Sequence, residues 1–100
     1  MAEIKKEING NTMNIALRGA LNSQSAPELD EIIKTCMADV TEIIFDFADL
    51  EYLTSAGLRV ILTAQQGMDE KDGIMTIKNV SQDIMGIFKM TGFLSILTII

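Results

Sequence analysis

Strand-like and helix-like hydrophobic patterns alternate along this chain of 100 residues. Residues 3–18 predict a hairpin, because Asn9-Gly10 is a strong tight-turn signal between two alternating segments. The later segments predict strands at 43–47, 74–78 and 95–100, and helices at about 25–38, 55–70 and 81–92. The order β-β-α-β-α-β-α-β predicts an α/β fold, in which parallel crossovers build a mixed sheet of four or five strands with about three helices.

The length and composition match one globular domain. No stretch of the chain resembles a linker, so we expect a single domain over residues 1–100. Hydrophobic residues make up 48% of the chain, which is enough to offset the entropy of ordering it. Met13, Ile15 and Leu17 of the hairpin and Cys36 of the first helix are predicted to face the core.

Charge and residue types exclude several classes of function. The net charge is -6 and the eight Lys and Arg residues are scattered, which argues against binding to nucleic acid. The absence of His removes Ser-His-Asp chemistry and His-ligated metals, and a single Cys allows no disulfide within the chain, so no metal or cofactor is expected. There is neither an apolar secretion signal nor a run long enough to span a bilayer. We therefore expect a cytoplasmic protein without membrane insertion.

The stretch YLTSAGLRV, from Tyr52 to Val60, joins a predicted strand to a predicted helix. Ser55 stands where the helical periodicity begins and is predicted to be the N-cap, a role worth about 1 kcal/mol relative to Ala. Gly57 is a poor helix former by about 1 kcal/mol, and its missing side chain is predicted to leave the Ser55 hydroxyl open to approach. Ser55 is thus either a structural cap or a site of modification.

Two carboxylates precede this stretch. Asp46 lies in a predicted strand and Asp49 in the predicted loop after it. Paired carboxylates can carry acid/base chemistry or bind a metal, which would make the chain a small enzyme. Turn formation and solvation are the favoured interpretation, because the chain has no phosphate-binding loop and any Ser nucleophile would lack a His base.

Three signals mark helix ends. Ser25 and Glu28 have the spacing of a capping box at the start of the first helix. Ser81 is predicted to cap the third helix, and Gly92 to end it.

Methionine and phenylalanine side chains near the second and third helices have two interpretations. Met68, Met85, Met90 and Phe93 predict either ordinary core packing or an apolar docking patch, because Met-rich surfaces adapt to partners.

Four segments together carry a resemblance to a known family. They are Gly19-Ala20-Leu21-Asn22 with Ser25-Ala26, Ile43-Ile44-Phe45-Asp46-Phe47, Leu50-Glu51-Tyr52-Leu53-Thr54-Ser55-Ala56-Gly57-Leu58, and Phe88-Lys89-Met90-Thr91-Gly92-Phe93. In these segments, and over nearly its whole length, the chain resembles a stand-alone STAS domain of the bacterial anti-sigma factor antagonist type.

The resemblance implies a regulatory binding module rather than an enzyme. It implies that the domain binds an anti-sigma factor that is also a GHKL-type serine kinase, that phosphorylation of Ser55 releases it, and that a metal-dependent Ser/Thr phosphatase reverses the modification. The partner-binding positions that it implies are Asn22, Ser23, Thr54, Ser55, Ala56, Gly57, Leu58 and Arg59.

At two positions the chain departs from the family pattern. Members that undergo this switch often have Asp where the chain has Thr54 and Asn22, so two negative charges beside Ser55 are missing. This departure, with the candidate Met and Phe patch, motivates an alternative function, a non-switching STAS scaffold or adaptor subunit of a larger signalling or lipid-transport complex.

Overall fold

The sheet begins with the hairpin that the turn signal predicts. The computed structural model describes residues 2–100, in which β1 (Ala2–Asn9) pairs antiparallel with β2 (Thr12–Leu21). Gly10 in the turn has φ +61°, in the left-handed region that a side chain would disfavour. The predicted hairpin is therefore confirmed.

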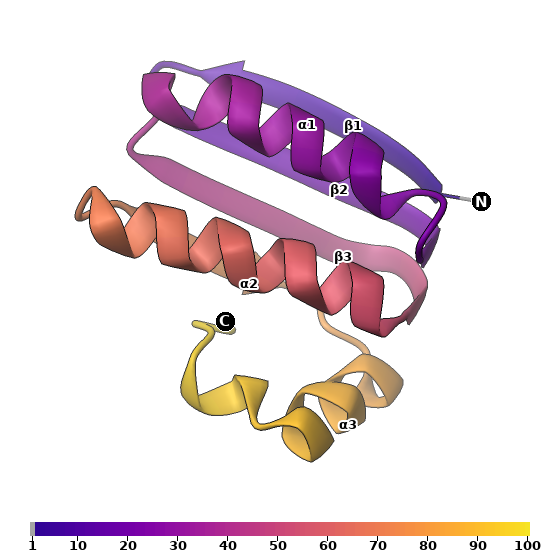
Figure 1. Ribbon diagram of the computed structural model, residues 1–100. Coiled ribbons are helices and arrows are strands. Elements are labelled where there is room, and N and C mark those ends of the chain that lie inside the picture. Colours follow the sequence, from indigo (N-terminus) through magenta and orange to yellow (C-terminus); the bar gives the residue numbers. More distant parts are fainter. Residues whose placement is uncertain (1) are drawn as a thin grey trace.

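Two parallel crossovers extend the sheet. β3 (Glu42–Leu53) runs parallel to β2, and β4 (Ile74–Lys78) runs parallel to β3, giving the strand order β1-β2-β3-β4. The connecting helices α1 (Ala26–Cys36) and α2 (Ser55–Glu70) lie side by side across one face of the sheet, and α3 (Gln82–Thr91) lies beyond α2 (Figure 1). The predicted mixed sheet with three helices is confirmed.

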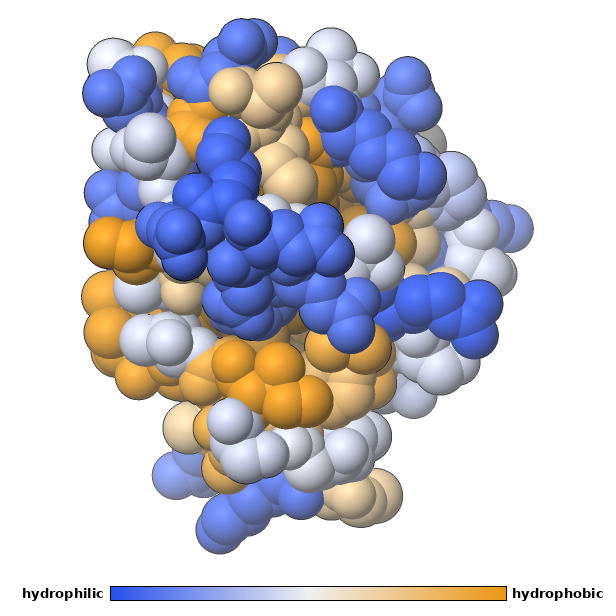
Figure 2. Space-filling model, turned by 60° about the vertical axis from the view of Figure 1, so that its left-hand side comes forward, coloured by the Kyte–Doolittle hydropathy of each residue, from blue (hydrophilic) through white to orange (hydrophobic). Residues whose placement is uncertain are grey.

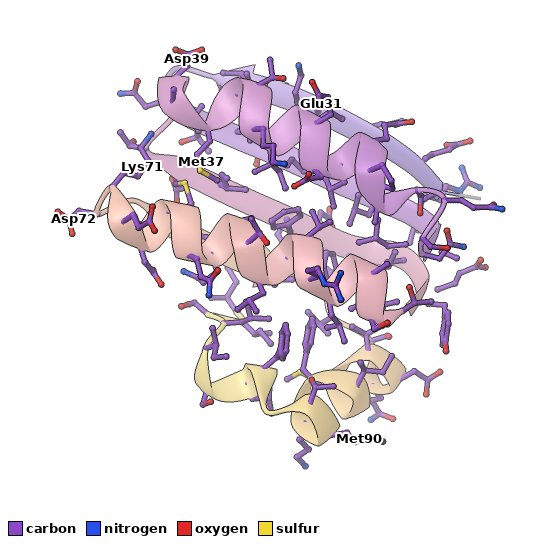
Figure 3. All side chains as sticks on the ribbon, in the orientation of Figure 1. Glu31, Met37, Asp39, Lys71, Asp72 and Met90 are labelled. Carbon is purple, nitrogen blue, oxygen red and sulfur yellow. The ribbon has the colours of Figure 1, made fainter. Side chains whose placement is uncertain are left out.

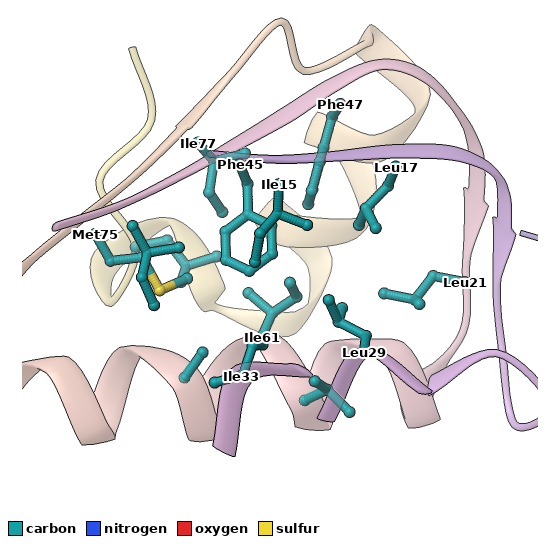
Figure 4. Packing of buried hydrophobic residues seen from close by; sticks show 14 of the residues in the cluster. Ile15, Leu17, Leu21, Leu29, Ile33, Phe45, Phe47, Ile61, Met75 and Ile77 are labelled. Carbon is teal, nitrogen blue, oxygen red and sulfur yellow. The ribbon is translucent and has the colours of Figure 1, made fainter. Parts of the chain in front are cut away.

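The core lies between this face of the sheet and the helices. Met13, Ile15 and Leu17 alternate inward along β2, as predicted, and each is at most 1% exposed. Ile15 and Leu17 face the side of the core that Ile33 and Ile61 of the helices occupy (Figure 4). Cys36 of α1 is also buried, as expected. The buried stripe of α2 includes Ile61, Ala64 and Met68, whose spacing of three and four residues explains why this segment is helical.

Several predicted ends were wrong. β2 continues through Leu21, where a connection was expected, and β3 runs from Glu42 to Leu53 rather than over 43–47. The predicted last strand at 95–100 forms only one parallel bridge, Ile77 to Ile99, after a 3-10 turn, η2 (Phe93–Ser95). Its backbone bonds to β4 run through Ile77 alone, which is too little to extend the sheet.

Of the ends predicted for the first and third helices, Ser81 and Gly92 are confirmed and the capping box at Ser25 is not. The Ser81 hydroxyl accepts a hydrogen bond from the Ile84 N–H at 3.2 Å, and Gly92 ends α3 at φ +80°, as predicted. The capping box at Ser25 was wrong, because the Ser25 hydroxyl accepts from the Asn22 N–H and donates to the Ala20 carbonyl. The hydroxyl thus fixes the loop after β2 instead of the first turn of α1.

A lysine connects the C-terminal ends of α1 and α2. The Lys71 ammonium, just past α2, donates to the carbonyls of Met37 at 2.5 Å and Val40 at 2.6 Å (Figure 3). These carbonyls follow the end of α1, where a cation interacts favourably with unpaired carbonyl groups. The contact fixes the ends of α1 and α2 relative to each other.

Part of the C-terminal third is apolar at the surface. Large hydrophobic side chains with substantial exposure there are Ile74, Met90, Leu94, Ile96 and Ile100. Figure 2 shows hydrophobic residues gathered below a strongly hydrophilic band on one face of the molecule. Met90 is 87% exposed, as the docking-patch interpretation requires, whereas Met68 is fully buried, as the core interpretation requires. None of the helices within residues 2–100 is long and apolar enough to cross a membrane.

Candidate functional site

The two loops that the sequence singled out lie next to each other. Leu21 at the end of β2 is the register partner of Leu53 at the end of β3. Beyond this pair, the Thr54 N–H donates to the Leu21 carbonyl at 3.0 Å. Because parallel strands end at the same edge of a sheet, the loop that begins at Asn22 and the start of α2 form one surface.

Ser55 is the first residue of α2 and not its cap. Thr54 has the N-cap position, with an extended backbone at φ -97° and ψ 177°, so the predicted cap role of Ser55 was wrong. The Ser55 side chain is exposed, and its hydroxyl makes no hydrogen bond within residues 2–100. The Ser55 hydroxyl can therefore be modified without breaking a hydrogen bond that stabilises the fold.

Thr54 does not cap the helix either. Its hydroxyl lies 3.5 Å from the Leu21 carbonyl instead of the first-turn N–H groups, and no side chain caps α2 in the described chain. The Leu58 N–H donates to the Thr54 carbonyl at 2.9 Å, so the helical hydrogen-bond pattern starts here. The N–H groups of the first turn thus stand without a side-chain acceptor beside Ser55.

Gly57 has a different role from the one predicted. It is buried, and a Cβ atom there would lie 2.7 Å from Leu53 Cδ1 and 2.9 Å from both Leu21 Cγ and the Leu21 carbonyl oxygen. The residue is small because α2 packs directly on the ends of β2 and β3. Its missing side chain faces the core, so the prediction that it clears an approach to Ser55 was wrong.

Asn22 organises the loop after β2. Its side-chain oxygen accepts from the N–H groups of Gln24 at 2.9 Å and Ser25 at 3.2 Å. A carboxylate has the same acceptor geometry, so Asp would fit here, and Asn fills the same role without the negative charge. The departure from the family pattern therefore changes the charge of the site and leaves the fold of the loop intact.

The structure brings the predicted partner-binding residues together but exposes only some of them. Ser23, Ser55 and Arg59 are exposed, while Asn22, Thr54 and Ala56 are half-buried and Gly57 and Leu58 are buried. The last two therefore support the surface and do not form it. Tyr52, which is 57% exposed and precedes Ser55 by three residues, was not among the predicted partner-binding positions. The residue type alone could have singled out this position, because Tyr is enriched at protein interfaces.

The carboxylates Asp46 and Asp49 do not form a paired site. Asp46 accepts hydrogen bonds from Asn79 Nδ2 at 2.9 Å and from the Ala48 N–H at 3.0 Å. Asp49 is exposed and lies within β3, not in a loop as expected, opposite Arg18 of β2. Within residues 2–100 no three His, Cys, Asp or Glu side chains are placed to hold a metal ion.

The hydrogen bond from Asn79, followed by that from the Ala48 N–H, lowers the pKa of Asp46 below its usual 3.8. Asp46 therefore stabilises the folded state above about pH 3.8, and this contribution is lost as the pH falls through the lower folded-state pKa. A carboxylate of this kind is ionised at neutral pH and is a weak base. The turn interpretation fits this geometry.

We expect Asn79→Gly to raise the pKa of Asp46 towards its usual value. Glycine retains the left-handed backbone that Asn79 adopts at φ 60°, so the variant removes the hydrogen bond without adding strain. An NMR titration of the Asp46 carboxyl carbon measures the change, with Asn14→Gly in β2 as a control expected to leave it unchanged. An Asp46 pKa that stays low in Asn79→Gly would contradict the role of Asn79 and assign the shift to the Ala48 N–H and the charge of Lys78.

Comparison with known proteins places the chain in a family. Residues 3–100 match the family model of the STAS domain. BtrV of Bordetella bronchiseptica, a candidate anti-sigma factor antagonist, is 30% identical over 81 residues, which cover 80% of this chain and 70% of BtrV. The anti-sigma-B factor antagonist of Bacillus subtilis is 24% identical over 91 residues, covering 91% of this chain and 84% of that protein.

The fold is also that of a solved anti-sigma factor antagonist. The structure of unphosphorylated SpoIIAA has a TM-score of 0.82 to this chain at 21% identity, covering 98% of this chain and 87% of the other. Phosphorylated SpoIIAA from Bacillus has a TM-score of 0.80 at 22% identity, covering 98% and 91%. With a matching family model over almost its full length, the chain belongs to the STAS domain family.

Proposed function

We propose that this chain is an anti-sigma factor antagonist that works by partner switching. It binds an anti-sigma factor with serine kinase activity, and phosphorylation of Ser55 by that kinase releases it. A metal-dependent Ser/Thr phosphatase restores the binding form. One observation carries the proposal: Ser55 is exposed at the start of α2 and its hydroxyl makes no hydrogen bond within the described chain, while Gly57 and Leu58 after it are packed into the core.

The surroundings of Ser55 suit a switch that acts on the partner. Leu53, Gly57 and Leu58 are buried and hold the start of α2 against the strands. A phosphoryl group at this point adds charge to a surface that is already rigid and lies at a helix N-terminus, where an anion is favoured. The domain can therefore stay folded while its interface changes.

The relatives support this proposal in two ways. The two curated relatives carry names of anti-sigma factor antagonists, one of them as a candidate. SpoIIAA has been solved in an unphosphorylated and a phosphorylated form, and this chain has nearly equal TM-scores of 0.82 and 0.80 to the two. A fold that matches both forms is consistent with a modification that leaves the architecture unchanged.

A kinase assay tests the proposal. The chain, immobilised as bait, is used to isolate the GHKL-type kinase of its own organism, which is then incubated with the free chain and ATP. We expect one phosphoryl group per chain by intact mass, and none on Ser55→Ala. Thr54→Ala should still carry its phosphoryl group on Ser55, and Thr63→Ala, an exposed hydroxyl on α2 outside the predicted partner-binding positions, is the matched control that should be phosphorylated normally. Phosphate on Thr54, or none on the native chain, would contradict the proposal.

A second function is favoured by a specific feature. The C-terminal third exposes the large apolar side chains of Ile74, Met90, Ile96 and Ile100, an apolar area that a switch at Ser55 does not use. A non-switching STAS scaffold or adaptor in a larger signalling or lipid-transport complex would use it. That function predicts stable co-purification with a non-kinase partner, lost on Met90→Glu and unaffected by Ser55→Asp.

A further inference from the structure

The charged residues of α2 lie at the ends of the helix where the helix dipole disfavours them. α1 and α3 each have an acidic residue in the first turn, Glu28 and Asp83, and a lysine in the last turn. α2 has neither, and its own acids, Asp69 and Glu70, stand at its C-terminal end. Arg59 is the only charged residue between Glu51 and Asp69. The start of α2 is therefore positive and has no acidic residue in its own first turn.

Arg59 stands one helical turn after Ser55 on the same side of α2. Side chains four residues apart on a helix are neighbours, and both of these are exposed. The Arg59 guanidinium forms no ion pair within residues 2–100, whereas the other arginine, Arg18, lies 4.0 Å from Glu3. Arg59 is thus free to turn towards a new negative charge on residue 55.

We propose that Arg59 binds the phosphate of phosphorylated Ser55 and fixes it on the surface of α2. The inference rests on the proposed modification of Ser55 and adds how the modified state is held. A guanidinium donates two parallel hydrogen bonds to phosphate oxygens, which is a directional contact that a lysine does not offer. The uncapped N–H groups of the first turn supply further donors for the same group.

This arrangement gives the two states different surfaces. In the unmodified domain Arg59 is a free cation beside a neutral hydroxyl, within the predicted partner-binding set. In the modified domain the same guanidinium is turned to the phosphate. The phosphate is then held in one geometry, in which the phosphatase meets it, and the modified domain gains stability from an ion pair within one helix.

The test separates this inference from the proposed function. Phosphoserine is introduced at position 55 during translation, so no kinase is needed, and the phosphate is titrated by phosphorus NMR. We expect the titration midpoint in Arg59→Gln to lie higher by about a few tenths of a pH unit than in the native background, because a nearby cation favours the dianion. The matched control Arg18→Gln should leave the midpoint unchanged.

Thermal unfolding gives a second measurement on the same proteins. Phosphorylation should raise the melting temperature of the native background by about 2–5 °C at low salt, and Arg59→Gln should remove about half of that rise. High salt should remove the same half of the rise in melting temperature, because salt screens the attraction between Arg59 and the phosphate. Arg59→Lys, which retains the charge without the planar fork, should fall between native and Arg59→Gln.

Equal midpoints for native and Arg59→Gln would overturn the inference, whatever the kinase assay shows. Conversely, a kinase that leaves Ser55 unmodified would contradict the proposed function while these midpoints still report on Arg59. Both arginine side chains are exposed, and the unphosphorylated variants serve as folding references for each measurement.

Discussion

Phosphorylation of Ser55 is expected to weaken binding to the anti-sigma factor about a thousandfold while the domain stays fully folded. The phosphoryl group adds about -1.5 to -2 charge units in the middle of the contact surface. A cost of about 4 kcal/mol for placing that charge against a desolvated partner surface corresponds to a factor of a thousand. On the domain itself the same charge lies at the N-terminus of α2 and is favourable.

Titration calorimetry with the kinase and thermal unfolding of the free domain measure the two quantities separately. Ser55→Asp should weaken binding less than phosphate does, because it adds one charge and no tetrahedral group. Ser55→Asn is the neutral control of similar size and should bind within a few-fold of the native chain. If the phosphorylated chain binds with unchanged affinity, or loses its fold instead, the mechanism is wrong.

Thr54 and Asn22 bear on the size of this effect. Both stand at positions where the resemblance implies Asp in members that switch. The unmodified surface around Ser55 therefore carries no negative side chain from these two positions. The added phosphate is then not accompanied by a carboxylate at either of these two positions. The structure accommodates both residues without a new fold, since Asn22 accepts the loop N–H groups and Thr54 sits at the N-cap position.

The central elements could be predicted because their hydrophobic periods are local and regular. The start of β3 alternates through Ile43, Phe45 and Phe47, and the pattern stops there in the sequence. The strand itself continues, because irregularities opposite β2 shift the pairing between Ala16 and Arg18 and again after Gly19. After the first irregularity the buried positions of β3 are Leu50 and Leu53, which are three residues apart and therefore do not follow a period of two.

The helix starts show why the site was harder to predict than the fold. Ser25, Ser55 and Ser81 have similar local sequence signals, yet only Ser81 caps its helix. The Ser25 hydroxyl is engaged by the end of β2, and Ser55 is displaced by one residue because Thr54 bonds to Leu21. Both outcomes depend on a strand that is distant in sequence, and capping signals contain no information about it.

Gly57→Ala is expected to destabilise the domain by about 1–3 kcal/mol, although alanine favours helices by about 1 kcal/mol. The new Cβ would lie 2.9 Å from the Leu21 carbonyl oxygen, which is backbone and already accepts the Thr54 N–H. The start of α2 and the end of β2 cannot move apart without breaking the hydrogen bond from the Thr54 N–H to the Leu21 carbonyl. Chemical denaturation measures the loss, and phosphorylation of Ser55 should also slow, because the residue two positions away is displaced.

Two other helical glycines are matched controls for this prediction. At Gly86 a Cβ meets nothing within 4 Å, so Gly86→Ala should stabilise the domain by about 0.5–1 kcal/mol. At Gly67 a Cβ meets only the flexible end of Met37, at 2.6 Å and 2.9 Å, and the helix gain and the displacement of that side chain should roughly cancel. If Gly57→Ala proves as stable as Gly86→Ala, the start of α2 does not rest on the strand ends as described. The position of Ser55 would then depend on the partner, because the fold would no longer fix it.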